Sequence, residues 1–136
     1  MANSYKDILM YELQVESDFS AAHNLRYYEG NCERLHGHNW RVVVSLKSEK
    51  LDSLGMVVDF KRIKEILKET LDQFDHHYLN DLPQFKETNP TTENLSRIIF
   101  ETMEKQLPEG VVMGSVTTWE SEKCSATYTK SPENAV

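Results

Sequence analysis

Two stretches of the chain alternate apolar and polar residues with the period of two that is typical of strands. Residues 11–19 alternate well, and residues 40–47 alternate more clearly. In the second stretch four apolar side chains share one face: Trp40, Val42, Val44 and Leu46. Two further stretches near the end of the chain, residues 111–119 and 124–130, are also expected to form strands. These patterns predict four strands.

Two segments between these pairs of strands repeat their apolar residues at spacings of three and four, as amphipathic helices do. They cover residues 59–74 and 92–107. Asp59 and Thr91 stand where N-caps are expected, and Pro108 follows the second segment. The order of elements predicts an α+β domain in which two helices cover one face of a four-stranded antiparallel sheet. The outer strands would then have free edges, which pairing with other subunits could cover.

The composition favours one soluble domain over residues 1–136, with frayed ends at about 1–8 and 131–136. The formal net charge of -7 disfavours nucleic acid as a partner, because phosphate binding needs clustered lysine and arginine. No apolar run approaches the ~20 residues of a membrane span, and the first residues lack the pattern of a signal peptide. Two cysteines are too few for a disulfide scaffold, so we expect a cytoplasmic protein with reduced thiols.

Histidine and cysteine are concentrated in one short segment, "CERLHGH" at residues 32–38, which holds three of the seven such residues in the chain. If the second strand extends back to residue 36, His36 and His38 continue the apolar face of Trp40. A third histidine, His23, follows the first strand and would lie beside them if the two strands pair. Three neutral imidazoles suit zinc, and a catalytic zinc usually keeps a fourth position open. The competing interpretation is three ordinary polar histidines in loops.

Cys32 lies outside the predicted strand and close to the predicted metal site. A nearby cation lowers the pKa of a thiol, so Cys32 could act as a base or a nucleophile. The alternative is a small buried apolar residue, which is what free cysteine most often is. Cys124 fits that second description, because it opens a predicted strand with no histidine nearby.

Another polar cluster is "FDHHYLND", residues 74–81, at the end of the first predicted helix. Asp75 could orient the imidazole of His76 and stabilise its charged form, although His77 competes for this role. The alternative is a histidine that interacts with the dipole at the helix C-terminus. Glu120 in "TTWESE" could hold a flat N–H/NH₂ edge through two hydrogen bonds, or it could be a solvated loop carboxylate.

Six motifs taken together resemble the family of 6-pyruvoyl- and 6-carboxy-tetrahydropterin synthases. They are "FSAAH", "CERLHGHNW", "GMVVDF", "FDHHYLND", "NPTTEN" and a late "WES", and they run in this order through most of the chain. The resemblance implies a T-fold of ββααββ order, in which three subunits form a barrel and two such trimers stack into a homohexamer. It also implies active sites between subunits, which would account for the pairing of the outer strands.

The resemblance assigns a role to each residue singled out above. Three positions match the zinc ligands of the family: His23, His36 and His38. Cys32 matches its catalytic thiol, and Asp75 and His76 match its Asp-His pair, which reaches a neighbouring subunit's site. Glu120 matches the glutamate that anchors the pterin ring. Two threonines resemble residues that line this ring: Thr91 and Thr92.

The short gap between Cys32 and the His-Gly-His motif, together with "DHHYLND", resembles the bacterial 6-carboxy-tetrahydropterin synthases of the queuosine pathway. The implied zinc-dependent reaction converts 7,8-dihydroneopterin triphosphate into 6-carboxy-tetrahydropterin, with release of acetaldehyde and triphosphate. Formation of 6-pyruvoyl-tetrahydropterin from the same substrate stays open, as does a non-catalytic pterin- or zinc-binding oligomer. A folate-linked branch has glutamate in place of the cysteine. Cys32 argues against that branch, although Glu33 stands beside it.

Overall fold

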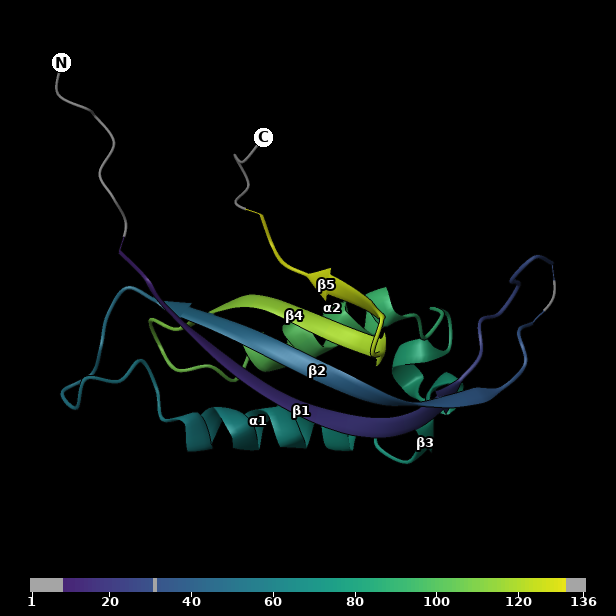
Figure 1. The fold of residues 1–136 in the computed structure, drawn as a ribbon, viewed down its shortest axis with the longest axis horizontal. Helices are drawn as coiled ribbons and strands as arrows, with labels where there is room; N and C mark the ends of the chain where they lie inside the picture. Colours follow the sequence, from purple (N-terminus) through teal and green to yellow (C-terminus); the bar gives the residue numbers. More distant parts are fainter. Residues whose placement is uncertain (1–8, 31, 132–136) are drawn as a thin grey trace, which may run out of the picture.

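The first two strands form one long hairpin that carries much of the candidate site. The computed structural model describes residues 9–30 and 32–131. Strands β1 (Tyr11–His23) and β2 (His36–Ser48) pair antiparallel along their whole length, and His23 lies opposite His36. Both strands are longer than the alternating patterns predict, and β2 does begin at His36 as the histidine argument requires. Figure 1 shows the hairpin running the length of the molecule.

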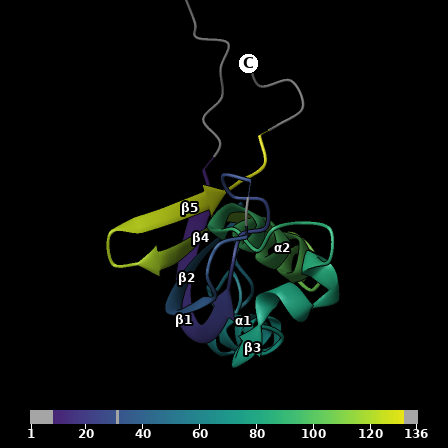
Figure 2. The same ribbon diagram turned by 90° about the vertical axis from the view of Figure 1, so that its right-hand side faces the viewer.

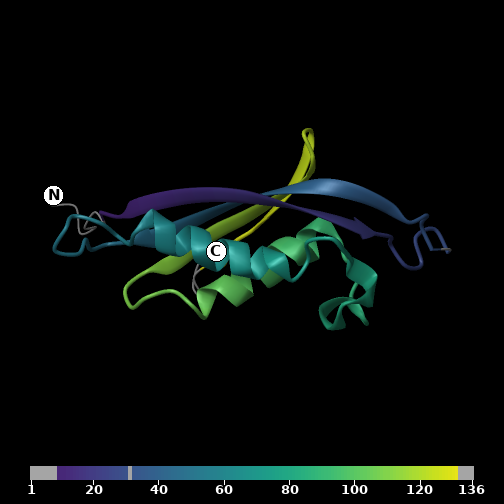
Figure 3. The same cartoon turned by 90° about the horizontal axis from the view of Figure 1, so that it is seen from below.

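Two helices cover one face of the sheet, as predicted. Helix α1 (Phe60–Asp72) packs on β1, and helix α2 (Thr92–Glu104) packs on β4 (Val112–Ser121) and β5 (Cys124–Tyr128). Figures 1 and 3 show both helices on the same side of the sheet. Both N-caps are confirmed, because the side chains of Asp59 and Thr91 accept hydrogen bonds from backbone N–H groups in the first turns. Both helices end before the predicted limits of 74 and 107.

The sheet has five strands, so the prediction of a four-stranded sheet is wrong. The additional strand, β3 (His77–Tyr78), pairs in parallel with Ala21 and Ala22 and gives the order β3-β1-β2-β4-β5. Two residues are too few to show an alternating pattern, which is why the sequence does not reveal this strand. Two short 3₁₀ turns follow it, Leu79–Asp81 and Pro83–Phe85. Figure 2 shows the β4–β5 hairpin at one edge of the sheet and β3 at the other, so the sheet of the described residues is open.

The hydrophobic core lies between the sheet and the two helices. Alternate residues of β2 point into it, and four of them are fully buried: Trp40, Val42, Val44 and Leu46. The helices contribute a second buried layer: Ile63, Ile66, Leu67, Leu71, Leu95, Ile99, Phe100 and Met103. Phe60, which the pattern places on the apolar face of the first helix, is 49% exposed because it opens that helix. Truncating a buried aromatic side chain such as Trp40 would cost about 3–5 kcal/mol, so this layer fixes the start of β2 firmly.

The remaining sequence expectations concern the chain ends and membrane spans. No helix within residues 9–30 and 32–131 is long and apolar enough to cross a bilayer. The fraying expected at residues 1–8 and 131–136 falls, apart from Ser131, outside the described residues.

Candidate metal centre and substrate site

The three predicted histidine ligands converge at the end of the β1–β2 hairpin. His23 closes β1, while His36 and His38 open β2, and all three lie on the face that also carries Trp40. Their ring centroids are 4.7 Å, 4.8 Å and 5.2 Å apart. The indole of Trp40 packs edge-on against His23 and His38 and donates its N–H to the carbonyl oxygen of Ala21. The buried, hydrogen-bonded indole of Trp40 therefore restricts the positions of the two histidine rings that it contacts.

Backbone carbonyls fix the tautomers of two of these rings. The Nδ1–H of His23 donates to the carbonyl oxygen of Pro90 at 2.7 Å, and that of His36 donates to the carbonyl oxygen of Arg34 at 2.8 Å. A carbonyl can only accept, so each Nδ1 carries a proton and each neutral ring presents a bare Nε2. The two Nε2 atoms are 3.1 Å apart. Metal-binding histidines usually have such an outer hydrogen bond, which aims the other nitrogen at the ion.

The side chain of Glu120 completes the cluster from strand β4. Its Oε1 atom lies 3.0 Å from Nε2 of His38 and 4.0 Å from Nε2 of His23. One ligand atom from each of the four residues lies within 4.8 Å of all the others. Tetrahedral zinc with bonds of about 2.0–2.1 Å requires ligand atoms roughly 3.3 Å apart. The separations of 3.1 Å between His23 and His36 and 3.0 Å between His38 and Glu120 are close to this value, and the longer ones would have to shorten around a bound ion.

The surroundings of His38 favour a neutral ligand. Burial lowers the pKa of His38, and the nearby carboxylate of Glu120 opposes this effect by raising it. Nε2 of His38 is enclosed and has no hydrogen-bond partner, because the contact with Glu120 lacks the direction of an N–H donor to an acceptor. An enclosed nitrogen without a partner is costly unless something binds it, and a cation among the four residues would do so. The residues present therefore fit a divalent metal.

The second predicted cluster, the Asp-His pair, is also formed. Oδ2 of Asp75 lies 3.0 Å from Nδ1 of His76, and Oδ1 accepts the backbone N–H of Ser20 at 2.9 Å. The Ser20 hydrogen bond, followed by that of His76, lowers the pKa of Asp75. His76 has a φ of 60°, a conformation that is uncommon for a residue with a side chain. His77 instead places Nδ1 2.8 Å from the backbone carbonyl of Asp75, so His76 is the partner of the carboxylate.

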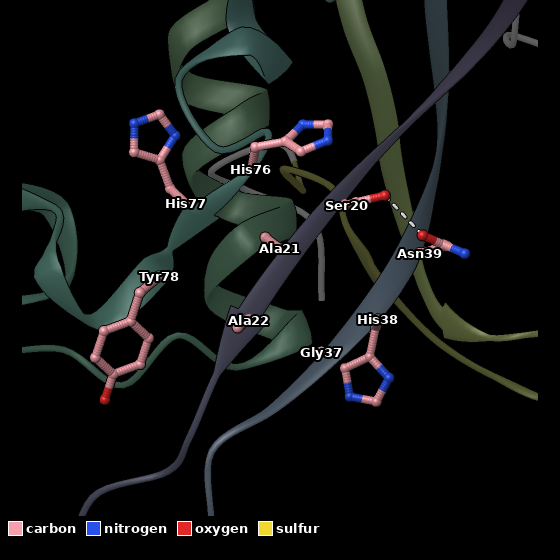
Figure 4. Close-up of a pocket in the computed structure, with 9 residues that line it drawn as sticks. All are labelled: Ser20, Ala21, Ala22, Gly37, His38, Asn39, His76, His77 and Tyr78. Atoms are coloured by element: carbon pink, nitrogen blue, oxygen red, sulfur yellow. Dashed lines mark hydrogen bonds between the residues drawn. The ribbon is translucent and has the colours of Figure 1, made fainter.

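The two clusters are separated within one chain. His76 lies at the outer edge of β1, where its backbone N–H donates to the carbonyl oxygen of Ser20, and its side chain is 82% exposed. His38 and His76 line the same open groove of about 540 Å³, but Figure 4 shows β1 running between them. Among the described residues no hydrogen bond or ion pair joins the Asp75–His76 pair to the histidine cluster.

Cys32 is exposed and lies in the loop that connects β1 to β2. Two hydrogen bonds, which we call the loop clamp, join the two ends of this loop. The backbone N–H of Glu33 donates to the carbonyl of Leu25 at 2.8 Å, and the side-chain amide of Asn24 donates to the carbonyl of Glu33 at 2.9 Å. Oε1 of Glu33 is 3.8 Å from Nδ1 of His36. The structure therefore places Cys32 next to the loop clamp and outside the four-residue cluster, while its neighbour Glu33 approaches a histidine.

The two predicted threonines lie at the start of helix α2. Thr91 caps this helix, and buried Thr92 donates its hydroxyl hydrogen to Oε2 of Glu120 at 3.0 Å. Thr92 thus fixes one carboxylate oxygen and leaves the other facing the histidines. Contact of either threonine with a pterin ring stays a prediction.

Sequence reasoning did not identify three parts of the site. The carbonyls of Pro90 and Arg34 leave no signature because any residue supplies one. The resemblance assigns Glu120 to the pterin, whereas its proximity to His38 follows from the pairing of β2 with β4, in which Arg41 lies opposite Trp119. Only the register of two strands that are distant in sequence could have shown this.

Comparisons with known proteins agree with the fold and the motifs. The family model described as 6-pyruvoyl tetrahydropterin synthase matches residues 12–131. A "6-carboxy-5,6,7,8-tetrahydropterin synthase" from Synechocystis sp. is 38% identical over 101 residues, which are 71% of this chain and 77% of that protein. A "6-pyruvoyl tetrahydrobiopterin synthase" from Dictyostelium discoideum is 41% identical over 86 residues, or 62% and 63% of the two chains.

A solved structure extends the agreement to almost the whole chain. The 6-pyruvoyl tetrahydropterin synthase of Caenorhabditis elegans superposes with a TM-score of 0.79 at 28% identity, covering 93% of this chain and 100% of the other. The expected T-fold is therefore present, with β3 as an addition to the predicted elements. On the match over residues 12–131, the chain belongs to the 6-pyruvoyl tetrahydropterin synthase family of lyase-type enzymes.

Proposed function

We propose that this protein is a zinc-dependent 6-carboxy-tetrahydropterin synthase of the queuosine pathway, acting on 7,8-dihydroneopterin triphosphate. The observation that carries the proposal is that three imidazoles lie together around one position. In His23 and His36, Nδ1 donates to a backbone carbonyl, so Nε2 is unprotonated and can bind a metal. The 38% identity with a relative of that name supports this branch. With one water consumed, the products would be 6-carboxy-tetrahydropterin, acetaldehyde and triphosphate.

The side chains divide the chemistry among them. Zinc, held by His23, His36 and His38, would supply Lewis acidity to the oxygens of the substrate side chain. Glu120, whose Oε2 accepts the hydroxyl hydrogen of Thr92, accepts hydrogen bonds from the amino-pyrimidine edge of the pterin. Two threonines line the ring: Thr91 and Thr92. Cys32, exposed in its loop, moves protons on one side of the substrate side chain.

The Asp-His pair moves protons on the other side of the substrate. Asp75 holds Nδ1 of His76, which leaves Nε2 free to exchange a proton with the substrate. Because β1 separates His76 from the metal cluster of its own chain, the pair serves the site of a neighbouring subunit. This arrangement supports a homohexamer of two stacked barrels, whose sheets join through the open edges at β3–β1 and β5. We place the enzyme in the cytoplasm.

A second candidate function is the formation of 6-pyruvoyl-tetrahydropterin from the same substrate. The 41% identity with the Dictyostelium discoideum relative of that class favours it. Mass spectrometry of the product from 7,8-dihydroneopterin triphosphate separates the two functions. We expect 6-carboxy-tetrahydropterin together with acetaldehyde, whereas a pyruvoyl product without acetaldehyde would overturn the carboxy assignment.

The same incubation tests whether the protein is an enzyme at all. A non-catalytic pterin- or zinc-binding oligomer would retain the metal cluster but release no triphosphate. The formed Asp75–His76 contact at 3.0 Å supports a catalytic protein, because pterin or zinc binding alone does not need it. Release of triphosphate by zinc-loaded protein is the expected result.

A further inference from the structure

Glu120 is held so that its two carboxylate oxygens face different partners. Oε2 accepts the hydroxyl hydrogen of Thr92 at 3.0 Å, and Thr92 is itself 8% exposed. Oε1 is turned towards the histidines, 3.0 Å from Nε2 of His38 and 4.0 Å from Nε2 of His23. Glu120 sits at an irregularity in the pairing of β4 with β5, between the paired residues Trp119 and Ser121. Such irregularities re-aim side chains at functional sites.

The contact with His38 differs from that of an ordinary supporting carboxylate. A supporting carboxylate accepts the N–H of the ring nitrogen that faces away from the metal. Glu120 instead approaches Nε2 of two histidines, and in His23 that is the bare nitrogen, because Nδ1 donates to Pro90. The geometry at Nε2 of His38 is not that of a hydrogen bond either. The ring nitrogens and the carboxylate oxygen are close together but not aimed at one another, as expected of ligands that point at a shared cation between them.

We propose that Glu120 is a fourth, exchangeable ligand of the metal: it binds the ion in the substrate-free protein and releases it when the pterin docks. Three imidazole nitrogens and one carboxylate oxygen form a tetrahedral zinc site with no open position. A site of that kind protects the metal but cannot accept a substrate. Departure of Glu120 opens one position, so the site becomes reactive only when a pterin is present.

The exchange follows from the shape of the substrate and rests on the proposed anchoring of the pterin by Glu120. The amino-pyrimidine edge and the side-chain oxygens lie at opposite ends of a pterin. A carboxylate that ligates the ion cannot at the same time bind the edge that lies farthest from it. The carboxylate leaves the metal with its negative charge and accepts the N–H groups of the ring, so no proton or electron transfer is needed.

Exchange of one carboxylate between two partners couples their affinities. A pterin that takes Glu120 from the metal weakens zinc binding, and zinc weakens pterin binding by the same factor. A suitable probe is 6-methylpterin, because it has the amino-pyrimidine edge but no side-chain oxygen that could replace the carboxylate. Its effect on zinc therefore reports the departure of Glu120 alone.

The test is a zinc titration against a chelator, with wild type and Glu120→Gln, each with and without saturating 6-methylpterin. We expect Glu120→Gln to bind zinc about 10–100-fold more weakly than wild type, and we expect 6-methylpterin to weaken zinc binding only in wild type. Glu122→Gln is the matched control, since Glu122 is exposed nearby on the turn between β4 and β5. Visible spectra of the cobalt-loaded protein provide a second readout, which should change on adding 6-methylpterin to wild type.

Two results would overturn the inference. Wild-type zinc affinity in Glu120→Gln would show that the carboxylate is not a ligand. Zinc affinity in wild type that is unaffected by bound 6-methylpterin would show that it is not exchanged. Failure of 6-methylpterin to bind, seen by its fluorescence, would refute the anchoring role and with it the exchange, while the zinc affinity of Glu120→Gln would still decide whether Glu120 is a ligand.

Discussion

The two halves of the candidate site differ in how completely one chain builds them. The metal cluster lies on the core face of the sheet, and the side chain of His23 is 4% exposed. Its tautomers are set by backbone carbonyls, and Trp40 supports it from below. The groups that we propose transfer protons lie outside the metal cluster: Cys32 is exposed in a loop, and the side chain of His76 is 82% exposed at a sheet edge. The four residues of the metal cluster thus meet within one chain, whereas Cys32 and the Asp75–His76 pair lie apart from it.

This difference indicates which properties depend on assembly. A metal site built from one hairpin and one strand should bind zinc whether or not subunits associate. On the proposed function, the Asp75–His76 pair, which β1 separates from the metal cluster of its own chain, acts on the site of another chain. The comparison predicts that mutations in the two halves change different measurements.

The largest effect is expected for His36→Ala, which removes one of the three proposed histidine ligands from the metal cluster. Zinc affinity should fall by more than about 100-fold, and turnover should be lost with it. Isothermal titration with zinc and a triphosphate-release assay measure the two effects. His77→Ala is the matched control, because His77 is exposed and the described hydrogen bond of its side chain is with the backbone carbonyl of Asp75. Equal zinc affinity in His36→Ala and wild type would refute the ligand assignment.

Cys32→Ala should abolish turnover and leave zinc binding and the fold unchanged, because Cys32 lies outside the cluster. A loss of at least about 100-fold is expected for a general acid or base. Cys124→Ala, a change to the other exposed cysteine at the start of β5, should keep wild-type activity. Full activity in Cys32→Ala would show that another group transfers the proton. Glu33, 3.8 Å from His36, would then be the first residue to test.

Mixing two inactive variants tests whether His76 and Cys32 from different chains act at one site. His76→Ala should lose about 100-fold or more of the turnover and keep wild-type zinc affinity. Co-expression of His76→Ala with Cys32→Ala should restore part of the activity, because some sites then combine an intact Cys32 from one chain with an intact His76 from another. Mixtures that stay as inactive as the separate variants would show that each site uses one chain only.

The smallest effect concerns stability and pH at Asp75. Its folded-state pKa is lowered, first by the backbone N–H of Ser20 and then by His76. The unfolded chain therefore binds more protons between the folded and unfolded pKa values, and stability rises with pH across that window. The contribution is present above about pH 4, the ordinary pKa of aspartate, and is lost as pH falls through the lowered folded value.

Urea unfolding of wild type and Asp75→Asn between pH 7 and pH 2.5 measures this contribution. We expect Asp75→Asn to be the less stable protein at neutral pH, with a difference that shrinks as the solution becomes more acidic. Asp81→Asn, which changes an exposed carboxylate in the adjacent 3₁₀ turn, provides the control. If the difference in the free energy of unfolding between wild type and Asp75→Asn stays constant with pH, titration of Asp75 does not contribute to stability.

Local patterns predicted most of the fold but less of the site. Alternation placed His36 and His38 on the face of Trp40, and the capping residues Asp59 and Thr91 were found, because these features depend on neighbours in the sequence. β3 was missed because two residues carry no periodicity. The position of Glu120 beside His38 depends on strand register, and the separation of His76 from the metal depends on the parallel pairing of β3 with β1. Both positions depend on pairing between segments that are distant in sequence, so local sequence patterns do not predict them.

The most direct measurement is X-ray absorption at the zinc edge on the zinc-loaded, substrate-free protein. The account predicts one zinc ion per chain, bound by three imidazole nitrogens and one oxygen at about 2.0–2.1 Å. A sulfur neighbour at about 2.3 Å, or fewer than three imidazoles around the ion, would contradict the convergence of His23, His36 and His38 on a single metal.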